Sequence, residues 1–142
     1  MSLKNSRIVD GISLAFIILW TYAALSKLFH FESFVYQLNQ SPLLGGYGKY
    51  MAILIPGIEL IISLLFVFER SRRIALKASF LLITIFTVYL IGMITFADKV
   101  PCSCGGIISR FTWDQHIVFN LFFIAIGLIA LLANKSKKVT QN

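Results

Sequence analysis

Four long runs of apolar residues alternate with short polar segments along this chain, and they predict its secondary structure. The runs cover residues 8–28, 51–68, 78–97 and 116–133. Each approaches or exceeds the roughly 18–20 residues that an α-helix needs to cross about 30 Å of hydrocarbon. The third run contains no charged residue. The pattern therefore predicts an all-α protein, a four-helix bundle that is integral to a membrane.

The connector between the first two runs has its own helical periodicity. Phe31, Phe34, Val35 and Leu38 recur at positions i, i+3, i+4 and i+7, with polar residues between them. This spacing is typical of a short amphipathic helix that lies along a membrane interface. Its simplest role is that of a lid over the bundle, which requires no ligand.

Composition agrees with a membrane protein. Of the 142 residues 58% are hydrophobic and 13% are charged, against about 45–50% and 25% in soluble domains. The economical interpretation is one membrane domain, residues 1–142. The net charge of +7 does not indicate nucleic-acid binding, because the basic residues flank the apolar runs. The first run is too long for the core of a signal peptide, about 7–15 residues, so we expect it to be a retained span.

The basic residues predict an orientation. One side of the predicted bundle carries nine of the 13 basic residues: Lys4, Arg7, Arg70, Arg72, Arg73, Lys77, Lys135, Lys137 and Lys138. The other carries Lys27, Lys49, Lys99 and Arg110. Because basic residues concentrate in cytoplasmic loops, we expect both termini inside (N-in/C-in) and residues 98–115 outside. In a bacterium that outer side is the periplasm, where disulfides persist.

The outer loop holds the two cysteines of the chain, in Pro101-Cys102-Ser103-Cys104-Gly105-Gly106. Cysteines two positions apart can close a disulfide, and the strain of so small a ring makes the bond exchange-competent. Gly105 and Gly106 give the backbone freedom to accommodate that ring. Nearby positive groups would stabilise a thiolate; they are Lys99, Arg110, His116 and the N-terminus of the fourth helix. Thiol–disulfide exchange is the favoured interpretation, with soft-metal binding or an inert pair as alternatives.

A polar stripe opens the fourth run. Trp113, His116 and Asn120 share one helical face, and Gly127 lies further along it, so this face is expected to pack inward. His116 there would act as a base or tuning group for a cysteine, or as a metal ligand with Cys102 and Cys104. A plain hydrogen bond to Asn120 or to a loop carbonyl is the simpler alternative.

Glu59 and Lys27 are charged residues within apolar runs. Glu59 is near the middle of the second run, where a charge costs at least about 2.5–3.5 kcal/mol. We expect either a protonated carboxyl that joins helices or a role with protons or a quinone. The candidate partners carry hydroxyls: Thr21, Tyr22, Ser26, Thr84, Thr87 and Tyr89. Lys27, at the end of the first run, is expected to extend to the head groups or to turn inward and favour a thiolate.

Several of these residues together resemble a known family. The segment Pro101–Gly106, followed by Trp113, His116 and Asn120, is similar to the membrane proteins typified by methylamine-utilisation protein E (MauE). Ser26-Lys27-Leu28, Ser41-Pro42-Leu43-Leu44 and Pro56 with Glu59 fit the same pattern. The helices alone resemble the broader DoxX-like group. The resemblance implies a redox-associated inner-membrane protein that helps to mature a disulfide-rich periplasmic subunit with a thioredoxin-like partner, and in which Cys102 and Cys104 are the exchanging pair.

The sequence therefore predicts a thiol–disulfide oxidoreductase in the lipid bilayer of the inner membrane. Gly105, Gly106, Trp113, Asn120, Lys27 and Glu59 would support the cysteines and His116. If electrons also pass to or from the membrane, a quinone between the helices is the natural carrier. Two alternatives stay open: a copper or zinc protein that uses Cys102, Cys104 and His116, and a scaffold subunit with incidental cysteines.

Overall fold

The structure is a computed structural model that describes residues 3–96 and 113–139, with side chains from 6 to 96 and from 114 to 134. Five α-helices make up the fold: α1 Leu3–Phe29, α2 Phe31–Gln40, α3 Gly48–Val67, α4 Arg72–Phe96 and α5 Trp113–Val139. The described residues include no strand. The predicted all-α architecture is confirmed.

Four of these helices are long and apolar enough to cross a membrane. Their spanning segments are Ser6–Phe29, Gly48–Val67, Arg72–Phe96 and Asp114–Asn134, of 24, 20, 25 and 21 residues. At 1.5 Å per residue each is as long as the hydrocarbon layer is thick. Their outer faces carry apolar side chains that are more than half exposed, such as Leu14, Ile18, Val88 and Leu132. Such a surface suits lipid, so the predicted membrane bundle is confirmed.

The start of α4 differs from its prediction. The apolar run begins at residue 78, whereas the helix begins at Arg72, directly after a short turn. Hydropathy marks the part of a helix that lies in lipid, while the hydrogen-bonded backbone continues through the charged first turns. The additional turns carry Arg72 and Arg73, which bind the neighbouring helices. Arg72 Nη1 donates to Asp10 Oδ1 at 2.6 Å, and Arg73 Nη2 donates to the Asn134 carbonyl at 3.0 Å.

The core occupies the half of the bundle nearer the termini. There α1 packs mainly on α3, and α4 packs mainly on α5. The Phe16 ring stacks on Phe66 with centroids 5.5 Å apart and meets Phe123 edge-on at 5.4 Å. A Cβ on Gly127 would lie 3.2 Å from Phe16 Cζ, so glycine permits this close approach of α5 to α1.

Helix α2 covers the other end of the bundle. Its buried residues Phe34 and Leu38 pack with Ala52 of α3. Asn39 Oδ1 accepts a hydrogen bond of 3.0 Å from the Gly48 amide and so links the end of α2 to the first turn of α3. The predicted amphipathic helix is confirmed, while its place at a membrane interface stays a prediction.

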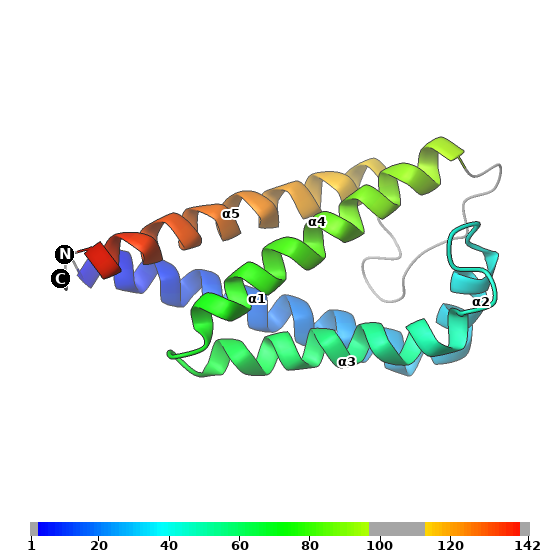
Figure 1. The fold of residues 1–142 in the computed structure, drawn as a ribbon, viewed down its shortest axis with the longest axis horizontal. Helices are drawn as coiled ribbons and strands as arrows, with labels where there is room; N and C mark the ends of the chain where they lie inside the picture. The colour runs from blue at the N-terminus through cyan, green and yellow to red at the C-terminus, as the bar shows by residue number, and fades with distance from the viewer. Residues whose placement is uncertain (1–2, 97–112, 140–142) are drawn as a thin grey trace.

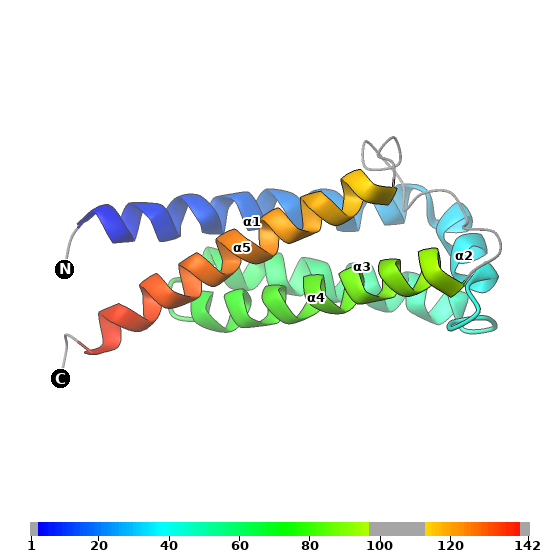
Figure 2. The ribbon, with the colours of Figure 1, turned by 90° about the horizontal axis from the view of Figure 1, so that it is seen from above.

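The two ends of the bundle carry different parts of the chain. Both termini and the α3–α4 turn lie at one end, and α2 lies at the other (Figures 1 and 2). Helix α4 finishes and α5 starts toward the α2 end (Figure 1). This arrangement puts the two termini on one side of a membrane, as predicted. Which side is the cytoplasm stays a prediction.

Candidate functional site

A cavity of about 310 Å³ lies at the α2 end, between the four spanning helices. Its wall is mainly aliphatic and aromatic, with Trp20, Phe34 and Phe86 among the rings. Polar side chains also reach it from all five helices: Tyr22, Ser26, Lys27, Gln37, Glu59, Tyr89, His116 and Asn120. An apolar cavity with a few convergent polar groups is the usual form of a small-molecule site.

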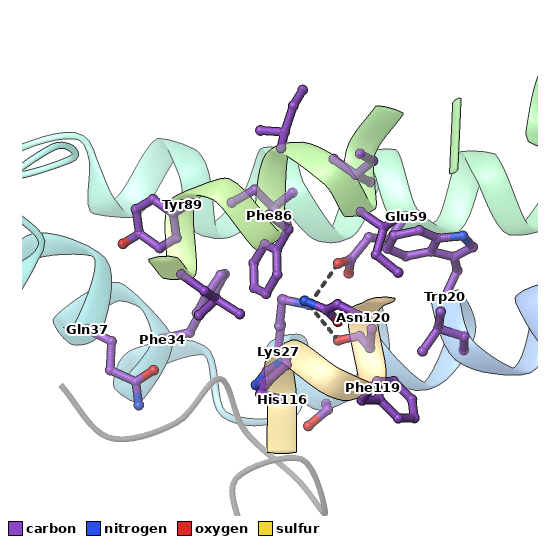
Figure 3. A pocket seen from close by; sticks show the side chains of 18 of the residues that line it. Trp20, Lys27, Phe34, Gln37, Glu59, Phe86, Tyr89, His116, Phe119 and Asn120 are labelled. Carbon is purple, nitrogen blue, oxygen red and sulfur yellow. Dashed lines mark hydrogen bonds and ion pairs between the residues drawn. The ribbon is translucent and has the colours of Figure 1, made fainter. Parts of the chain in front are cut away.

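An ion pair between α1 and α3 lies in the cavity wall. Lys27 Nζ and Glu59 Oε1 are 2.7 Å apart, and their side chains are 6% and 4% exposed. Lys27 belongs to the last turn of α1 and folds back along it, so that Nζ also lies 3.4 Å from the Ala23 carbonyl (Figure 3). Each charge compensates the other in a region where an unpaired charge would be costly.

This pair decides between the two alternatives for Lys27 and gives Glu59 a partner that was not expected. Lys27 does not extend to the head groups but turns inward, and it binds Glu59. Glu59 does join two helices, and the partner that the structure shows is Lys27. Of the hydroxyls proposed as its partners, Thr21 shares a hydrogen bond of 2.7 Å with Ser63. Thr84 and Thr87 donate to carbonyls of their own helix, at 2.7 Å each.

The polar stripe of α5 does face inward. His116, Asn120 and Gly127 are all buried, which confirms the predicted packing of this face. The His116 ring centroid lies 6.0 Å from that of Phe86, and Lys27 Nζ lies 5.9 Å from the same Phe86 centroid. His116 and the ion pair therefore share one aromatic neighbour within the cavity wall. The side chain of Trp113 lies outside the described part.

Three polar atoms of the cavity residues have no hydrogen-bond partner in the described part of the chain. They are Glu59 Oε2, Asn120 Nδ2 and Ser26 Oγ, all fully buried. A buried polar atom without a partner costs about 1–3 kcal/mol, so such atoms call for an explanation. Glu59 Oε2 can accept a hydrogen bond and Asn120 Nδ2 can donate one, and both residues line the cavity.

The predicted cysteine motif falls outside the described residues. Cys102, Cys104, Gly105 and Gly106 lie between the last residue of α4 and the first of α5. Because these two helix ends lie toward α2 (Figure 1), the motif is connected to the end of the bundle that holds the cavity. The described residues contain no group of three His, Cys, Asp or Glu that could hold a metal. The alternative of a copper or zinc site would therefore require Cys102 and Cys104 as ligands in addition to His116.

Sequence reasoning grouped Lys27, Glu59 and Asn120 with His116 and the cysteines, but it did not predict the ion pair between Lys27 and Glu59. A signal for the ion pair was present, since these are opposite charges in consecutive spans. No comparable signal existed for Trp20, whose Nε1 donates a hydrogen bond of 2.8 Å to Ser79 Oγ. The cavity beside it results from side chains of five helices, and no single helical pattern contains that information.

Comparison with known proteins identifies one family. The chain matches the family described as "Methylamine utilisation protein MauE" over residues 5–133. The matched range includes the cysteine motif and every polar residue of the cavity. No curated protein matches the chain, and no solved structure does.

Proposed function

Because the chain belongs to the MauE family of membrane proteins, we propose that it is a thiol–disulfide redox protein of the bacterial inner membrane. Cys102 and Cys104 would exchange disulfides on the periplasmic side with a soluble thioredoxin-like protein. Such an exchange would serve the maturation of periplasmic proteins. The observation that carries the proposal is the buried polar cluster of Lys27, Glu59 and His116, at the end of the bundle to which the cysteine motif is connected.

The exchange itself conserves atoms and electrons. With the pair reduced, a thiolate attacks one sulfur of the partner's disulfide, and the other partner sulfur leaves as a thiolate. The second cysteine then attacks the sulfur of the mixed disulfide. A Cys102–Cys104 bond forms, and the partner is released as a dithiol. The same steps in reverse transfer a disulfide from the partner to the pair.

The polar cluster supports this chemistry through its position. Thiol exchange requires a thiolate, and positive groups or bases close to a cysteine promote one. His116 lies in the first turn of α5, three residues after the helix begins. It can take up or return the proton of a cysteine in the segment that precedes α5. Lys27 and Glu59, bound to each other, would hold the surrounding helices in place.

The orientation rests on the distribution of basic residues. The end of the bundle with both termini also carries Arg72 and Arg73, whereas the opposite end carries Lys27 and α2. By the positive-inside rule the termini face the cytoplasm and the cysteine motif faces the periplasm. The same conclusion gives the pair access to soluble periplasmic partners.

A trapping experiment tests the proposal. In Cys104→Ser or Cys102→Ser protein, the remaining cysteine cannot resolve a mixed disulfide. We therefore expect one of the two variants to retain a thioredoxin-like protein covalently in intact cells, in a complex that dithiothreitol releases. The double variant Cys102→Ser/Cys104→Ser is the matched control and should retain none. No covalent partner in either single variant, together with stoichiometric copper or zinc on reduced cysteines in the unaltered protein, would favour the metal-binding alternative.

A further inference from the structure

We infer that the cavity at the α2 end binds the head group of a membrane quinone, with Asn120 as hydrogen-bond donor and Glu59 as acceptor. The residues that carry this inference all belong to the described part of the chain. Only its place in electron transfer rests on the proposed function. The ligand class follows from the size of the cavity, its wall, the two polar atoms without partners and the exposure of one wall residue on the outside of the bundle.

The cavity has the size and wall that an aromatic head group needs. Its volume of about 310 Å³ falls at the lower end of the range of roughly 300–1,000 Å³ for small-molecule sites. Trp20, Phe34 and Phe86 offer ring surfaces to a planar ligand, and offset or edge-on ring contacts favour such a ligand over an acyl chain.

The polar atoms distinguish a quinone from a purely apolar occupant. Asn120 Nδ2 is a buried donor and Glu59 Oε2 a buried acceptor, and each lacks a partner in the described chain. Their residues are 4% and 3% exposed. A quinone carbonyl accepts a hydrogen bond, which suits Asn120. A quinol hydroxyl donates one, which suits Glu59. The two atoms thus match the oxidised and the reduced form of the same ligand.

One residue of the cavity wall also lies on the outer surface of the bundle. Ile85 of α4 lines the cavity and is 57% exposed. The proposal places the exit of an isoprenoid tail past this residue, into the bilayer, where burial of the tail is favourable.

Quinone binding would supply the oxidant for the cysteine pair. Two thiols lose two electrons and two protons as two S–H bonds break and the Cys102–Cys104 bond forms. The quinone gains the same two electrons and two protons as two O–H bonds form. Membrane quinone can accept thiol electrons in the bacterial periplasm. Glu59 and His116 both line the cavity and are placed to pass protons to the reduced ring.

Tryptophan fluorescence gives a direct test of binding. The chain has two tryptophans, so a Trp113→Phe background leaves Trp20 in the cavity wall as the reporter. Titration of this protein in lipid nanodiscs with decylubiquinone should quench the Trp20 emission to saturation. Decylbenzene, which has the tail but no oxygens, should compete poorly.

The side chain of Asn120 provides the discriminating variant. Asn120→Leu keeps the volume of the side chain but removes the donor, so we expect the quinone to bind about tenfold more weakly. Thr84→Val is the matched control, because Thr84 bonds only its own helix and does not line the cavity. Equal affinity in Asn120→Leu protein that elutes as a folded species, or full displacement of the quinone by decylbenzene, would overturn the assignment.

A cysteine-free protein separates this inference from the proposed function. Cys102→Ser/Cys104→Ser protein should bind the quinone with unchanged affinity. If it does, and no thioredoxin-like partner is trapped by the single variants, the proposed function fails while the binding site stands. If partners are trapped but Trp20 is not quenched, the quinone site fails while disulfide exchange stands.

Discussion

Lys27 and Glu59, 32 positions apart in the chain, meet at 2.7 Å in the wall of a cavity between the spanning helices. The ion pair links the last turn of α1 to the middle of α3. It also places both signs of charge beside His116 and Asn120, in a region that otherwise consists of apolar side chains. Several measurable consequences follow from this arrangement.

The first prediction concerns the stability that the ion pair provides. Lys27→Met leaves the Glu59 carboxylate buried without its partner, which should lower the stability by about 3–5 kcal/mol. The double variant Lys27→Met/Glu59→Leu removes both charges and should recover most of that loss. Thermal unfolding in detergent, followed by the loss of the folded peak in size-exclusion chromatography, measures both effects.

The ion pair between Asp10 and Arg72 is the control. Asp10 is 52% exposed there, so Asp10→Asn should cost no more than about 1 kcal/mol. If Lys27→Met were as well tolerated as Asp10→Asn, the buried pair would not hold α1 against α3.

A second prediction concerns the close packing of α2 on α3. A Cβ on Gly48 would lie 2.8 Å from the Val35 carbonyl and would also meet the Asn39 side chain. Gly48→Ala should therefore lower the stability by about 1–3 kcal/mol. Gly57, in the same helix, has no atom within 4 Å of such a Cβ, so Gly57→Ala should be neutral or stabilising. Indistinguishable melting temperatures for the two variants would contradict the described docking of α2.

A third prediction concerns Trp20. Ser79→Ala removes the acceptor of the hydrogen bond from Trp20 Nε1 and leaves a buried donor without a partner. We expect a loss of about 1–3 kcal/mol and a changed Trp20 emission in the Trp113→Phe background. Thr84→Val serves as comparison, because it removes a hydroxyl that bonds only its own helix. An unaltered spectrum after Ser79→Ala would show that Trp20 does not make this contact.

A fourth prediction concerns orientation. After reduction, Cys102 and Cys104 should react with a membrane-impermeant thiol reagent added to spheroplasts. In a cysteine-free background, Ser71→Cys in the α3–α4 turn should react only after the membrane is permeabilised. The reverse pattern of labelling would place the termini outside and would remove the periplasmic assignment of the cysteines.

The fold was largely predictable because a membrane span leaves a strong pattern in the sequence. A continuous apolar run fixes the existence of each spanning helix, and the spacing of Phe34 and Leu38 located α2. The 3.6-residue period also predicted that His116, Asn120 and Gly127 face inward. Helix α4 begins six residues before its apolar run, since Arg72 and Arg73 belong to the helix but not to its apolar part.

The site was predictable only in its parts. Periodicity tells which face of a helix is buried, but not which face of another helix lies opposite. Hydroxyls were therefore the candidate partners of Glu59, and Lys27 had two alternatives, the head groups or the interior. The cavity depends on how side chains from five helices fill space together. Its orphaned atoms, Glu59 Oε2 and Asn120 Nδ2, can be recognised only once those neighbours are in place.

The central claim is that Cys102 and Cys104 exchange disulfides with a thioredoxin-like protein, and a transfer measurement tests it most directly. The oxidised protein in nanodiscs is mixed with an equal amount of the reduced partner. The reaction is quenched with acid, free thiols are alkylated, and the mass of each chain is measured by mass spectrometry. We predict that two alkyl groups appear on this chain as two disappear from the partner, in equal amounts and within minutes. A chain whose mass stays unchanged while the partner keeps both thiols would contradict the claim.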